Sequence, residues 1–489
     1  MKTFYVCTAI PYVNDKAHIG HAMDFLYADI LARYHRQQGD EVIFSIGTDE
    51  HGAKIAEKAE DAGVSPQEFV DKIVPLWQDF AKKAGISNDK FIRTTDEAHE
   101  QRAVMIWKNL SEYIYRGSYT GWYCVGCEEY KTETHVKETE GECPDHKRKY
   151  DKLEEDNYFF KLSAFGEKIE AAIKSGEFKV IPKFREKEIM NIINDGLEDI
   201  SISRPTEKIT WGIGVPGDKT QVMYVWFEAL MNYITVLGYP EHADFTKFWP
   251  ADVQVIGKDI LRFHAAIWPA MLMGLGLSLP KVMYAHGHVS SDGQKMSKTL
   301  GNVIDPQEVI EAQGLDAFRY FLARHISSYD DGDFTWDKFN SAYNNELANE
   351  LGNGVSRVAA MVTKYQEGVI GDIPEPGHDT ARYHEALSEC RFDKALEEVW
   401  GQVRGLNTYI EEEKPWAVAK EGDAEHLREV LAYMVGALLE IAELLVPFLP
   451  DTAAKISAVF AKGVVNMPKE SLFPRINTRK TPEHSAKHE

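Results

Sequence analysis

Apolar residues in the first part of the chain alternate between short continuous runs and a longer segment of helical periodicity. Residues 3–10 (TFYVCTAI) are rich in aromatic and β-branched types, which is typical of a buried strand. A helical pattern from Ile19 to Gln38 follows, and Gly39 is placed to end it. Residues 42–46 (VIFSI) repeat the strand pattern. This β-α-β order predicts the start of a doubly wound parallel sheet.

The strand pattern is interrupted and then resumes. Apolar periodicity weakens near residue 118 and returns near residue 221. Buried strands are expected at 253–256 and 282–285, with an apolar helix at 260–275 between them. We therefore predict an α/β fold whose Rossmann-type parallel sheet is split by an inserted module.

The pattern from about residue 305 to 465 is almost entirely helical, which predicts an all-α helical bundle after the sheet domain. The expected divisions are the first half of the sheet domain (1–117), an inserted connective module (118–215), the second half of the sheet domain (216–303), a linker region (304–345), the helical domain (346–465) and a C-terminal tail (466–489).

Composition limits the classes of function. The 489 residues carry a formal net charge of −22, which argues against a protein that coats nucleic acid but leaves room for a local basic groove. The apolar segment 430–449 contains Glu440 and Glu443, and its strongest apolar positions step by three and four, so we predict a core helix and no membrane span. The absence of a signal peptide and an odd number of cysteines, five, predict the cytoplasm.

Two histidines, His18 and His21, flank Gly20 directly after the first strand and at the start of the first helix. Loops at the carboxyl edge of such a sheet bind ligands, and a helix N-terminus favours an anion such as phosphate. Two imidazoles on the first turn can add hydrogen-bond donors to phosphate oxygens. The alternative is a pair of surface histidines beside a tight turn.

A second motif, GQKMSKTLGN at 293–302, follows the strand 282–285 and reaches the same edge of the sheet. Lys295 and Lys298 flank Met296 and Ser297 in a loop with glycines on both sides. Two ammonium groups on a loop that can close are suited to neutralising a transferring phosphoryl group. A solvated basic loop is the alternative for this motif taken alone.

HIGH at 18–21 followed far downstream by KMSKT at 295–299 resembles the class I aminoacyl-tRNA synthetases. Threonine stands at 299 where that family usually has serine, and it keeps the hydroxyl. The resemblance implies that both motifs bind ATP, with Mg²⁺, and stabilise the α-phosphorus, so His18, His21, Lys295 and Lys298 are the expected catalytic residues. The resemblance further implies an ATP site made of Pro11, His18, Gly20, His21, Gly257, Asp259, Lys295, Met296, Ser297 and Lys298.

Longer segments resemble the methionyl-tRNA synthetases within that class, and they cover nearly the whole chain. The matching segments, in order, are AIPYVNDKAHIGH (9–21), GTDEHG (47–52), YVWFEALMNY (224–233), VIGKDILRFHAAIWPAM (255–271) and KMSKTLGN (295–302). Leu230 stands where that family often has proline. The resemblance implies a methionine pocket formed by Ile10, Tyr12, Asp49, Trp226, Ala229, Tyr233, Ile260, His264 and Trp268.

These residue types suit a methionine substrate. Aromatic edges favour a polarizable thioether. Asp49 is expected to pair with the substrate ammonium, and Tyr12 and His264 are expected to hold the sulfur, a weak hydrogen-bond acceptor. Ordinary core packing is the alternative for Trp268 and Tyr233.

The inserted module carries a CxxC and a CxxH pair, formed by Cys124, Cys127, Cys143 and His146. Four such ligands satisfy one tetrahedral Zn²⁺ and leave no open position, which predicts one structural zinc per chain and makes 118–215 a zinc-binding module. A redox CxxC and unrelated cysteines remain as alternatives. The resemblance agrees with a single zinc knuckle. Cys7 and Cys390 are expected to be buried as small hydrophobes.

The helical domain 346–465 is expected to bind the tRNA anticodon, and the region 304–345 to contact the tRNA stem. The resemblance assigns anticodon contacts to Asn353 and Arg357, one helical turn apart, and to Trp416 as a stacking platform. A buried tryptophan at a helix start is the alternative for Trp416. The chain ends at Glu489 without the C-terminal barrel of many relatives, which favours a monomer.

The resulting hypothesis is activation of L-methionine by ATP and transfer to tRNA(Met), including the initiator tRNA. Synthetases for leucine, valine or isoleucine usually carry a much larger insertion, and a cysteine enzyme needs a metal in the active site itself. A tRNA-binding protein that has lost catalysis is the alternative from a different class. Intact His18, His21, Lys295 and Lys298 argue against it.

Overall fold

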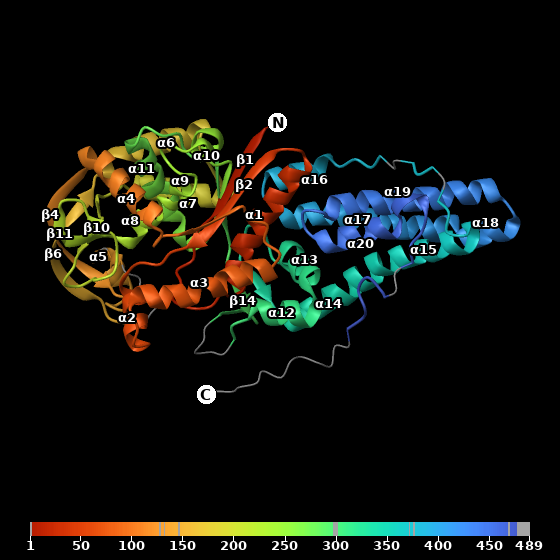
Figure 1. Ribbon diagram of the computed structural model, residues 1–489, viewed down its shortest axis with the longest axis horizontal. Coiled ribbons are helices and arrows are strands. Elements are labelled where there is room, and N and C mark those ends of the chain that lie inside the picture. Colours follow the sequence, from red (N-terminus) through yellow and green to blue (C-terminus); the bar gives the residue numbers. More distant parts are fainter. Residues whose placement is uncertain are drawn as a thin grey trace. The chain divides into compact units, whose positions relative to one another are not determined.

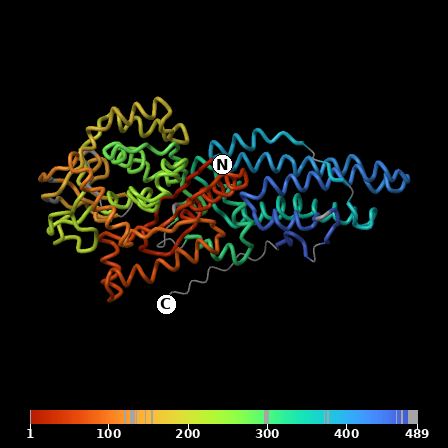
Figure 2. The backbone as a smooth tube through the Cα atoms, turned by 45° about the horizontal axis from the view of Figure 1, so that its top comes forward, coloured from red at the N-terminus to blue at the C-terminus, as the bar shows by residue number. Residues whose placement is uncertain are grey.

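The computed structural model describes residues 2–126, 129–131, 133–144, 147–296, 302–370, 372–374, 377–467 and 470–476. The chain forms two compact units, of which unit 1 comprises 1–16, 41–79 and 88–285 and unit 2 comprises 17–40, 80–87 and 286–489. The chain therefore passes from one unit to the other more than once. Figures 1 and 2 show the elements of both units coloured along the sequence.

A six-stranded sheet forms the centre of unit 1. Its order is β3 (Lys90–Arg93), β2 (Glu41–Thr48), β1 (Thr3–Thr8), β12 (Val253–Gly257), β13 (Val282–His286) and β7 (Lys179–Ile181). The pairs β3–β2, β2–β1, β1–β12 and β13–β7 are all parallel. The predicted α/β fold with a parallel sheet is confirmed.

The central strands are buried along almost their whole length, as expected for a parallel sheet covered on both faces. Only Thr3 is exposed in β1, and the last six residues of β2 are buried. Tyr5 and Cys7, on one face of β1, belong to a large apolar cluster that also includes Phe160, Phe227 and Trp268. Continuous runs of β-branched and aromatic residues thus produce the core of unit 1.

Helices and short turns of unit 1 connect these strands. They are α2 (Ala53–Asp61), α3 (Pro66–Lys83), whose last turn belongs to unit 2, α4 (Glu97–Asn109), η1 (Ser111–Tyr113), α5 (Glu133–Glu138), η2 (Leu162–Phe165), α6 (Gly166–Ser175), α7 (Lys183–Asn194), α8 (Val225–Ala229), α9 (Asn232–Thr235), α10 (Ala243–Phe248), η3 (Lys258–Ile260), the π-helical segment η4 (Phe263–Ile267) and α11 (Trp268–Gly274). The single helix expected at 260–275 is therefore divided into segments of different helical type.

Two small antiparallel sheets lie within 114–223. One has the order β5 (Glu129–Lys131), β4 (Ile114–Cys124), β6 (Asp151–Phe160), β8 (Ile200–Ser201). The other has the order β10 (Gly214–Val215), β11 (Asp218–Met223), β9 (Ser203–Pro205). The expected module 118–215 is not wholly separate from the main sheet, because β7 from its middle pairs with β13.

Unit 2 contains α1 (Ile19–Gln37), which ends as expected before Gly39 at φ 82°. The later elements are β14 (Val289–Ser291), β15 (Gln294–Lys295), α12 (Pro306–Gln313), α13 (Leu315–His325), β16 (Gly332–Phe334), α14 (Trp336–Ala342), the π-helical η6 (Tyr343–Gly352), α15 (Asn353–Gln366), α16 (Ala381–Ser388), α17 (Phe392–Glu413), α18 (Pro415–Glu421), α19 (Ala424–Leu445), α20 (Pro450–Val459) and η7 (Ala461–Gly463). Apart from the short strand β16, the expectation of helices from about 305 to 465 is confirmed.

The bundle of unit 2 packs α15, α17, α19 and α20 side by side (Figures 1 and 2). Helix α19 buries every apolar position that the sequence pattern assigned to its core face, namely Leu427, Leu431, Met434, Leu438, Ile441 and Leu445. Among the described residues, no helix has the length and apolar character needed to cross a bilayer.

Candidate functional site

The strand order of the main sheet reverses between β1 and β12. Thr8 lies opposite Val255, and the N–H of Ala9 donates to the Val255 carbonyl at 2.9 Å. Doubly wound sheets bind ligands at the carboxyl edge of such a switch point. The loops 10–12 and 257–259 both leave the sheet at this edge, and they carry several of the predicted ligand-binding residues.

The loops that follow β1 and β2 are bonded to each other. The N–H of Asp49 donates to the Pro11 carbonyl at 2.9 Å, and the N–H of Val13 donates to the Asp49 carbonyl at 3.1 Å. Tyr12 and Asp49 are therefore paired as in adjacent parallel strands. Asp49 is only 4% exposed, so its carboxyl group lies almost entirely out of water.

Ile10 packs beside the end of β2 because position 47 has no side chain. A Cβ on Gly47 would lie 3.0 Å from Cγ2 of Ile10 and 2.3 Å from the carbonyl oxygen of Ile92. The glycine of the GTDEHG segment thus allows the loop that carries Ile10 to approach the strand that leads to Asp49.

His264 is held as a hydrogen-bond acceptor toward Tyr233. Its Nδ1 lies 3.0 Å from the Ile260 carbonyl, which only accepts, so Nδ1 carries the proton. The Tyr233 hydroxyl then donates to Nε2 at 2.7 Å. Burial lowers the pKa of His264 to about 4, although the Ile260 hydrogen bond and nearby Asp259 oppose the shift, so the ring is neutral at pH 7. The expected hydrogen bond from His264 to the substrate sulfur has no donor in this arrangement, and His264 instead orients Tyr233.

Aromatic rings surround this pair. Tyr233 contacts Trp268 with ring centroids 5.7 Å apart, and Trp226 stacks on Phe263 at 4.4 Å. Five of the nine predicted methionine residues are buried, namely Asp49, Ala229, Tyr233, His264 and Trp268. The other four are half-buried, namely Ile10, Tyr12, Trp226 and Ile260. Core packing and ligand binding both fit the buried set, whereas the half-buried residues keep part of their surface accessible, as a ligand contact requires.

Gly257 and Asp259 begin the loop after β12. A Cβ on Gly257 would lie 2.8 Å from Oδ1 of Asp259, so the carboxyl group folds back over the glycine backbone. Asp259 is exposed and Pro11 is half-buried. These are the three predicted ATP residues that belong to unit 1.

His18 and His21 of unit 2 cap helix α1 with their own side chains. Nδ1 of His18 accepts the Gly20 N–H at 3.1 Å, and Nδ1 of His21 accepts the His18 N–H at 3.3 Å. The two rings stack with centroids 3.8 Å apart. Desolvation of the ring by the surrounding chain lowers the pKa of His18, with Asp24 opposing and His288 adding to the shift, so this imidazole is neutral at pH 7.

The segment before the second predicted motif is bonded to the same helix. Nε2 of His286, at the end of β13, lies 2.7 Å from Oδ1 of Asp24 on α1. The hairpin β14–β15 follows, with a tight turn at Asp292 (φ 52°) and Gly293 (φ 72°). This order places the backbone of Lys295 on a short strand.

Asp333 holds this hairpin in position. Its Oδ1 accepts the Gly293 N–H at 2.8 Å and the Ser290 hydroxyl at 2.9 Å. Met296 is half-buried. Ser297, Lys298 and Thr299 lie outside the described residues.

Two of the four predicted zinc ligands are described. Cys124 and Cys143 are both buried in a small apolar cluster with Val136 and Tyr150. Cys143 begins a turn in which its carbonyl accepts the Lys147 N–H at 2.8 Å. The other two, Cys127 and His146, lie outside the described residues, and the described part of the chain holds no group of three or more potential metal ligands. Two thiols from separate segments in one cluster fit the predicted pairing of half-sites.

The predicted anticodon residues lie on the helices of unit 2. Asn353 is the exposed first residue of α15, and Arg357 on the next turn forms an ion pair at 2.7 Å with Glu411 of α17. Trp416, near the start of α18, is 42% exposed. The alternative of a buried tryptophan at this helix start is therefore wrong. Cys7 and Cys390 are buried, as expected.

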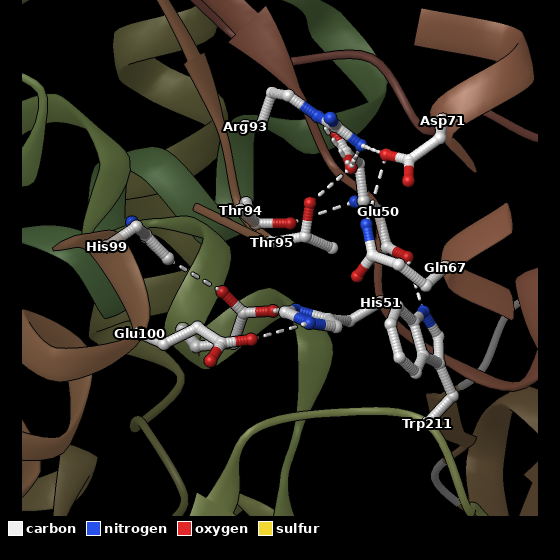
Figure 3. A network of polar contacts seen from close by, with 11 residues as sticks. Glu50, His51, Gln67, Asp71, Arg93, Thr94, Thr95, His99, Glu100 and Trp211 are labelled. Atoms are coloured by element: carbon white, nitrogen blue, oxygen red, sulfur yellow. Dashed lines mark hydrogen bonds and ion pairs between the residues drawn. The ribbon is translucent and has the colours of Figure 1, made fainter. Parts of the chain in front are cut away.

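Sequence reasoning missed a buried polar network that begins next to Asp49 (Figure 3). Glu50 accepts hydrogen bonds from Thr48, Thr95 and Arg93. His51, the next residue, pairs with Glu228. The only signal in the sequence was the position of these charged residues inside the segments GTDEHG and YVWFEALMNY.

An open cavity of about 360 Å³ lies in unit 1 between the start of α4 and the end of α9, and His99 and Thr235 are among the residues that line it. Lys90, Arg102 and His242 are among its lining residues. None of the nine predicted methionine residues lines this cavity, so its size does not bear on the methionine assignment.

Comparison with known proteins gives consistent matches. The chain matches the family described as "tRNA synthetases class I (M)" over residues 4–155 and 147–359. A methionine–tRNA ligase of Caldanaerobacter subterraneus subsp. tengcongensis is 41% identical, over 98% of this chain and 80% of that protein. A methionine–tRNA ligase of Streptomyces coelicolor is 43% identical, over 93% of this chain and 89% of that protein. The solved structure of Mycobacterium tuberculosis methionyl-tRNA synthetase in complex with methionyl-adenylate superposes with a TM-score of 0.91 at 34% identity, covering 97% of this chain and all of that one.

Proposed function

Because the chain belongs to the methionyl-tRNA synthetases, a family of class I tRNA synthetases, we propose a role for each predicted group in its reaction. The enzyme is an ATP-dependent methionine–tRNA ligase. A methionine carboxylate oxygen attacks the α-phosphorus of ATP, and the bond to the β-phosphate oxygen breaks to release pyrophosphate. A terminal ribose hydroxyl of the tRNA then attacks the adenylate carbonyl, loses its proton, and displaces AMP. Positioning and charge stabilisation carry both steps.

The pairing of the Tyr12 and Asp49 loops supports the methionine assignment most strongly, and the hydrogen bond between the Tyr233 and His264 side chains adds to it. The buried carboxylate of Asp49 pairs with the substrate ammonium. Trp226, with Phe263 stacked behind it, and Tyr233 enclose the thioether, which favours contact with aromatic edges. The neutral His264 ring keeps the Tyr233 hydroxyl in one orientation.

The stacked histidines bind the phosphates of ATP. Because Nδ1 of each ring already accepts a backbone N–H, the proton of each neutral ring resides on Nε2, which donates to a phosphate oxygen. The N-terminus of α1 adds its partial positive charge. Lys295 and Lys298 neutralise the charge that develops at the α-phosphate, with Mg²⁺ bound to ATP, and Pro11, Gly257 and Asp259 contact the nucleotide.

Cys124, Cys127, Cys143 and His146 hold one zinc ion. The two described thiols are buried in one cluster. One half-site with two cysteines and one with a cysteine and a histidine together supply the four soft or borderline donors that tetrahedral Zn²⁺ requires. The ion closes the inserted module and takes no part in the reaction.

Unit 2 reads the tRNA. The exposed indole of Trp416 offers a stacking surface to an unpaired base, and Asn353 and Arg357 offer hydrogen bonds from one helical face. We assign elongator and initiator tRNA(Met) as substrates, a monomer as the working form, and the cytoplasm as its location.

The experiment that tests this function is methionine-dependent exchange of pyrophosphate into ATP, run with each of the twenty amino acids in the absence of tRNA. Exchange with methionine alone is the expected result. Exchange with a different amino acid overturns the pocket assignment and keeps the ATP chemistry. Folded, zinc-loaded protein that exchanges with none overturns the proposal, and binding of tRNA without ATP turnover then favours the non-catalytic alternative.

A further inference from the structure

Glu228 lies between two histidines in the interior of unit 1. It belongs to α8, and its side chain is completely buried. Nδ1 of His51 donates to Oε1 at 2.8 Å, and Nε2 of His99 donates to Oε2 at 3.0 Å. Both histidines are also buried, at 2% and 1% exposure. Each oxygen of one carboxylate is therefore fixed by a different element, the loop after β2 and helix α4.

The protonation of the network follows from its partners. Because a carboxylate only accepts, His51 Nδ1 and His99 Nε2 both carry protons. Nδ1 of His99 is 2.8 Å from the Thr235 hydroxyl, and Nε2 of His51 is 3.6 Å from the carboxylate of Glu100. His51 thus faces carboxylates on both sides, which favours its charged form, whereas the second nitrogen of His99 faces a hydroxyl, which can donate or accept.

Three members of this network neighbour proposed methionine residues along the chain. His51 is two residues from Asp49, and Thr235 is two residues from Tyr233. Glu228 lies between Trp226 and Ala229 on the single turn of α8. The network therefore ties together the backbone segments that carry the proposed ammonium partner and the proposed thioether contacts.

We propose that Glu228 is a positioning residue that fixes the separation between Asp49 and the Trp226–Tyr233 side of the methionine pocket. The proposal rests on the methionine assignment made above. Asp49 recognises the ammonium and the aromatic side recognises the thioether, so their separation determines which side-chain length fits. Glu228 touches neither substrate nor reacting atoms.

The chemistry of the network suits orientation better than stability. Burial of a carboxylate and an imidazolium costs desolvation free energy that their attraction only partly offsets, so apolar residues of similar volume would stabilise the interior at least as well. Two directed hydrogen bonds from separate elements to one planar carboxylate fix both distance and angle, which apolar packing does not do. A displacement of about 1 Å in such a support is enough to change catalysis by about a hundredfold.

The test compares two amino acids in pyrophosphate exchange, methionine and its longer homologue ethionine, with purified full-length protein. Glu228→Gln keeps the shape of the side chain but removes its charge and presents an NH₂ group to one of the donors. We expect the KM for methionine to rise about tenfold or more. The fold-increase in the KM for ethionine should be at least three times smaller than that for methionine, so discrimination by side-chain length falls. The KM for ATP should change less than twofold.

A loss of general stability predicts a different result. Glu346→Gln is the matched control, since Glu346 also bonds several side chains, Tyr320, Arg324 and His325, but lies in unit 2 on η6. We expect this variant to lower the melting temperature without changing either KM. A parallel rise of both amino-acid KM values in Glu228→Gln, or no rise, overturns the positioning role.

Two further variants keep the outcomes distinguishable. Trp226→Ala tests the pocket itself, and an unchanged methionine KM in that variant overturns the pocket assignment together with this proposal. A raised KM in Trp226→Ala beside unchanged discrimination in Glu228→Gln overturns the positioning role alone. If Glu228→Gln does not fold, Thr235→Val removes the hydrogen bond to His99 together with the long 3.4 Å bond to the Asn232 carbonyl. We then expect a smaller loss of discrimination in the same direction, about two- to fivefold. Unchanged discrimination in that variant overturns the proposal.

Discussion

His18 and His21 cap the N-terminus of α1 with their own side chains. Nδ1 of His18 accepts the Gly20 N–H at 3.1 Å, and Nδ1 of His21 accepts the His18 N–H at 3.3 Å. This reciprocal arrangement resembles a capping box in which imidazoles replace the usual hydroxyl and carboxylate. It fixes the tautomer of each neutral ring and leaves Nε2–H as the outward donor. The spacing of two histidines around Ile19 and Gly20 therefore orients two Nε2–H donors, as their proposed role at the phosphates of ATP requires.

Gly20→Ala is expected to disrupt this pair. A Cβ at position 20 would lie 2.9 Å from Cε1 and 3.1 Å from Nδ1 of His18, so the ring must move and its cap is lost. We expect kcat/KM for ATP in pyrophosphate exchange to fall about tenfold or more, with an unchanged KM for methionine. Gly401→Ala, in an open position inside α17, is the matched control and should be neutral or stabilising. Equal activity of both variants would remove the proposed role of the stacked rings.

Lys295→Ala is expected to lower the rate of adenylate formation on the order of a hundredfold or more, because loss of one transition-state cation typically has that effect. Single-turnover measurement at saturating ATP and methionine separates this loss from weaker binding. Lys394→Ala, which removes a surface lysine paired with Glu397, is the control and should react at the normal rate. A rate within twofold of normal for Lys295→Ala would refute its place at the phosphate.

The fold was predictable where local patterns decide it. Apolar runs located β1, β2, β12 and β13, and the glycine at 39 located the end of α1. Strand β7 was not predicted as part of the sheet, because it is a three-residue strand whose pairing with β13 is set by a segment about one hundred residues away along the chain, and short runs between helices carry little periodicity.

The site was predictable only as residue types. The motifs identified His18, Tyr233 and His264 as candidates but did not predict their hydrogen bonds. The neutral state of His264, which lets it accept from Tyr233, follows from its burial and from its hydrogen bond to the Ile260 carbonyl. The partners of Glu228 lie 177 and 129 residues away in sequence. Such pairings depend on the assembled sheet, and no pattern along a single chain encodes them.

The His51–Glu228 pair makes stability depend on pH. Burial alone would lower the pKa of His51, but the Glu228 carboxylate, with smaller contributions from Glu100 and Asp49, raises it to about 10. An unfolded histidine titrates near 6.5, so above that pH the folded protein keeps a proton that the unfolded chain has lost. The contribution of the pair is full below about pH 6.5 and declines as the pH rises toward about 10.

His51→Gln should therefore cost more stability at about pH 7 than at about pH 9. The measurement is the difference between the denaturation midpoints of the native protein and the variant at each pH. Glu228, whose pKa is lowered by His51 and His99 against its burial, is ionised at both values and does not reverse the trend. A gap that stays constant or widens with pH would show that His51 is not charged in the folded protein.

Cys124→Ser is expected to remove the zinc ion. The native protein should contain one zinc per chain by elemental analysis, and the variant markedly less, with an earlier onset of thermal unfolding because ligand binding energy contributes to folding. Cys390→Ser is the control for loss of a buried thiol, since Cys390 lies in a different unit and in an apolar environment. Native protein that contains no zinc, and gains no stability when zinc is added, would favour unrelated cysteines.

Trp416→Ala should separate tRNA recognition from amino-acid activation. Trp416 is 42% exposed, and stacking of one base on an aromatic ring is typically worth about 1–3 kcal/mol. We expect kcat/KM for tRNA(Met) in aminoacylation to fall about ten- to a hundredfold, with pyrophosphate exchange unchanged.

Phe184→Ala, which removes an aromatic side chain of similar exposure (41%) from unit 1, should leave both reactions unchanged. The sharper comparison uses a tRNA with an altered anticodon. Because the contact proposed for Trp416 is with an anticodon base, the native enzyme should prefer the methionine anticodon and Trp416→Ala should lose that preference. A preference that survives in Trp416→Ala would place anticodon recognition on other residues of the bundle.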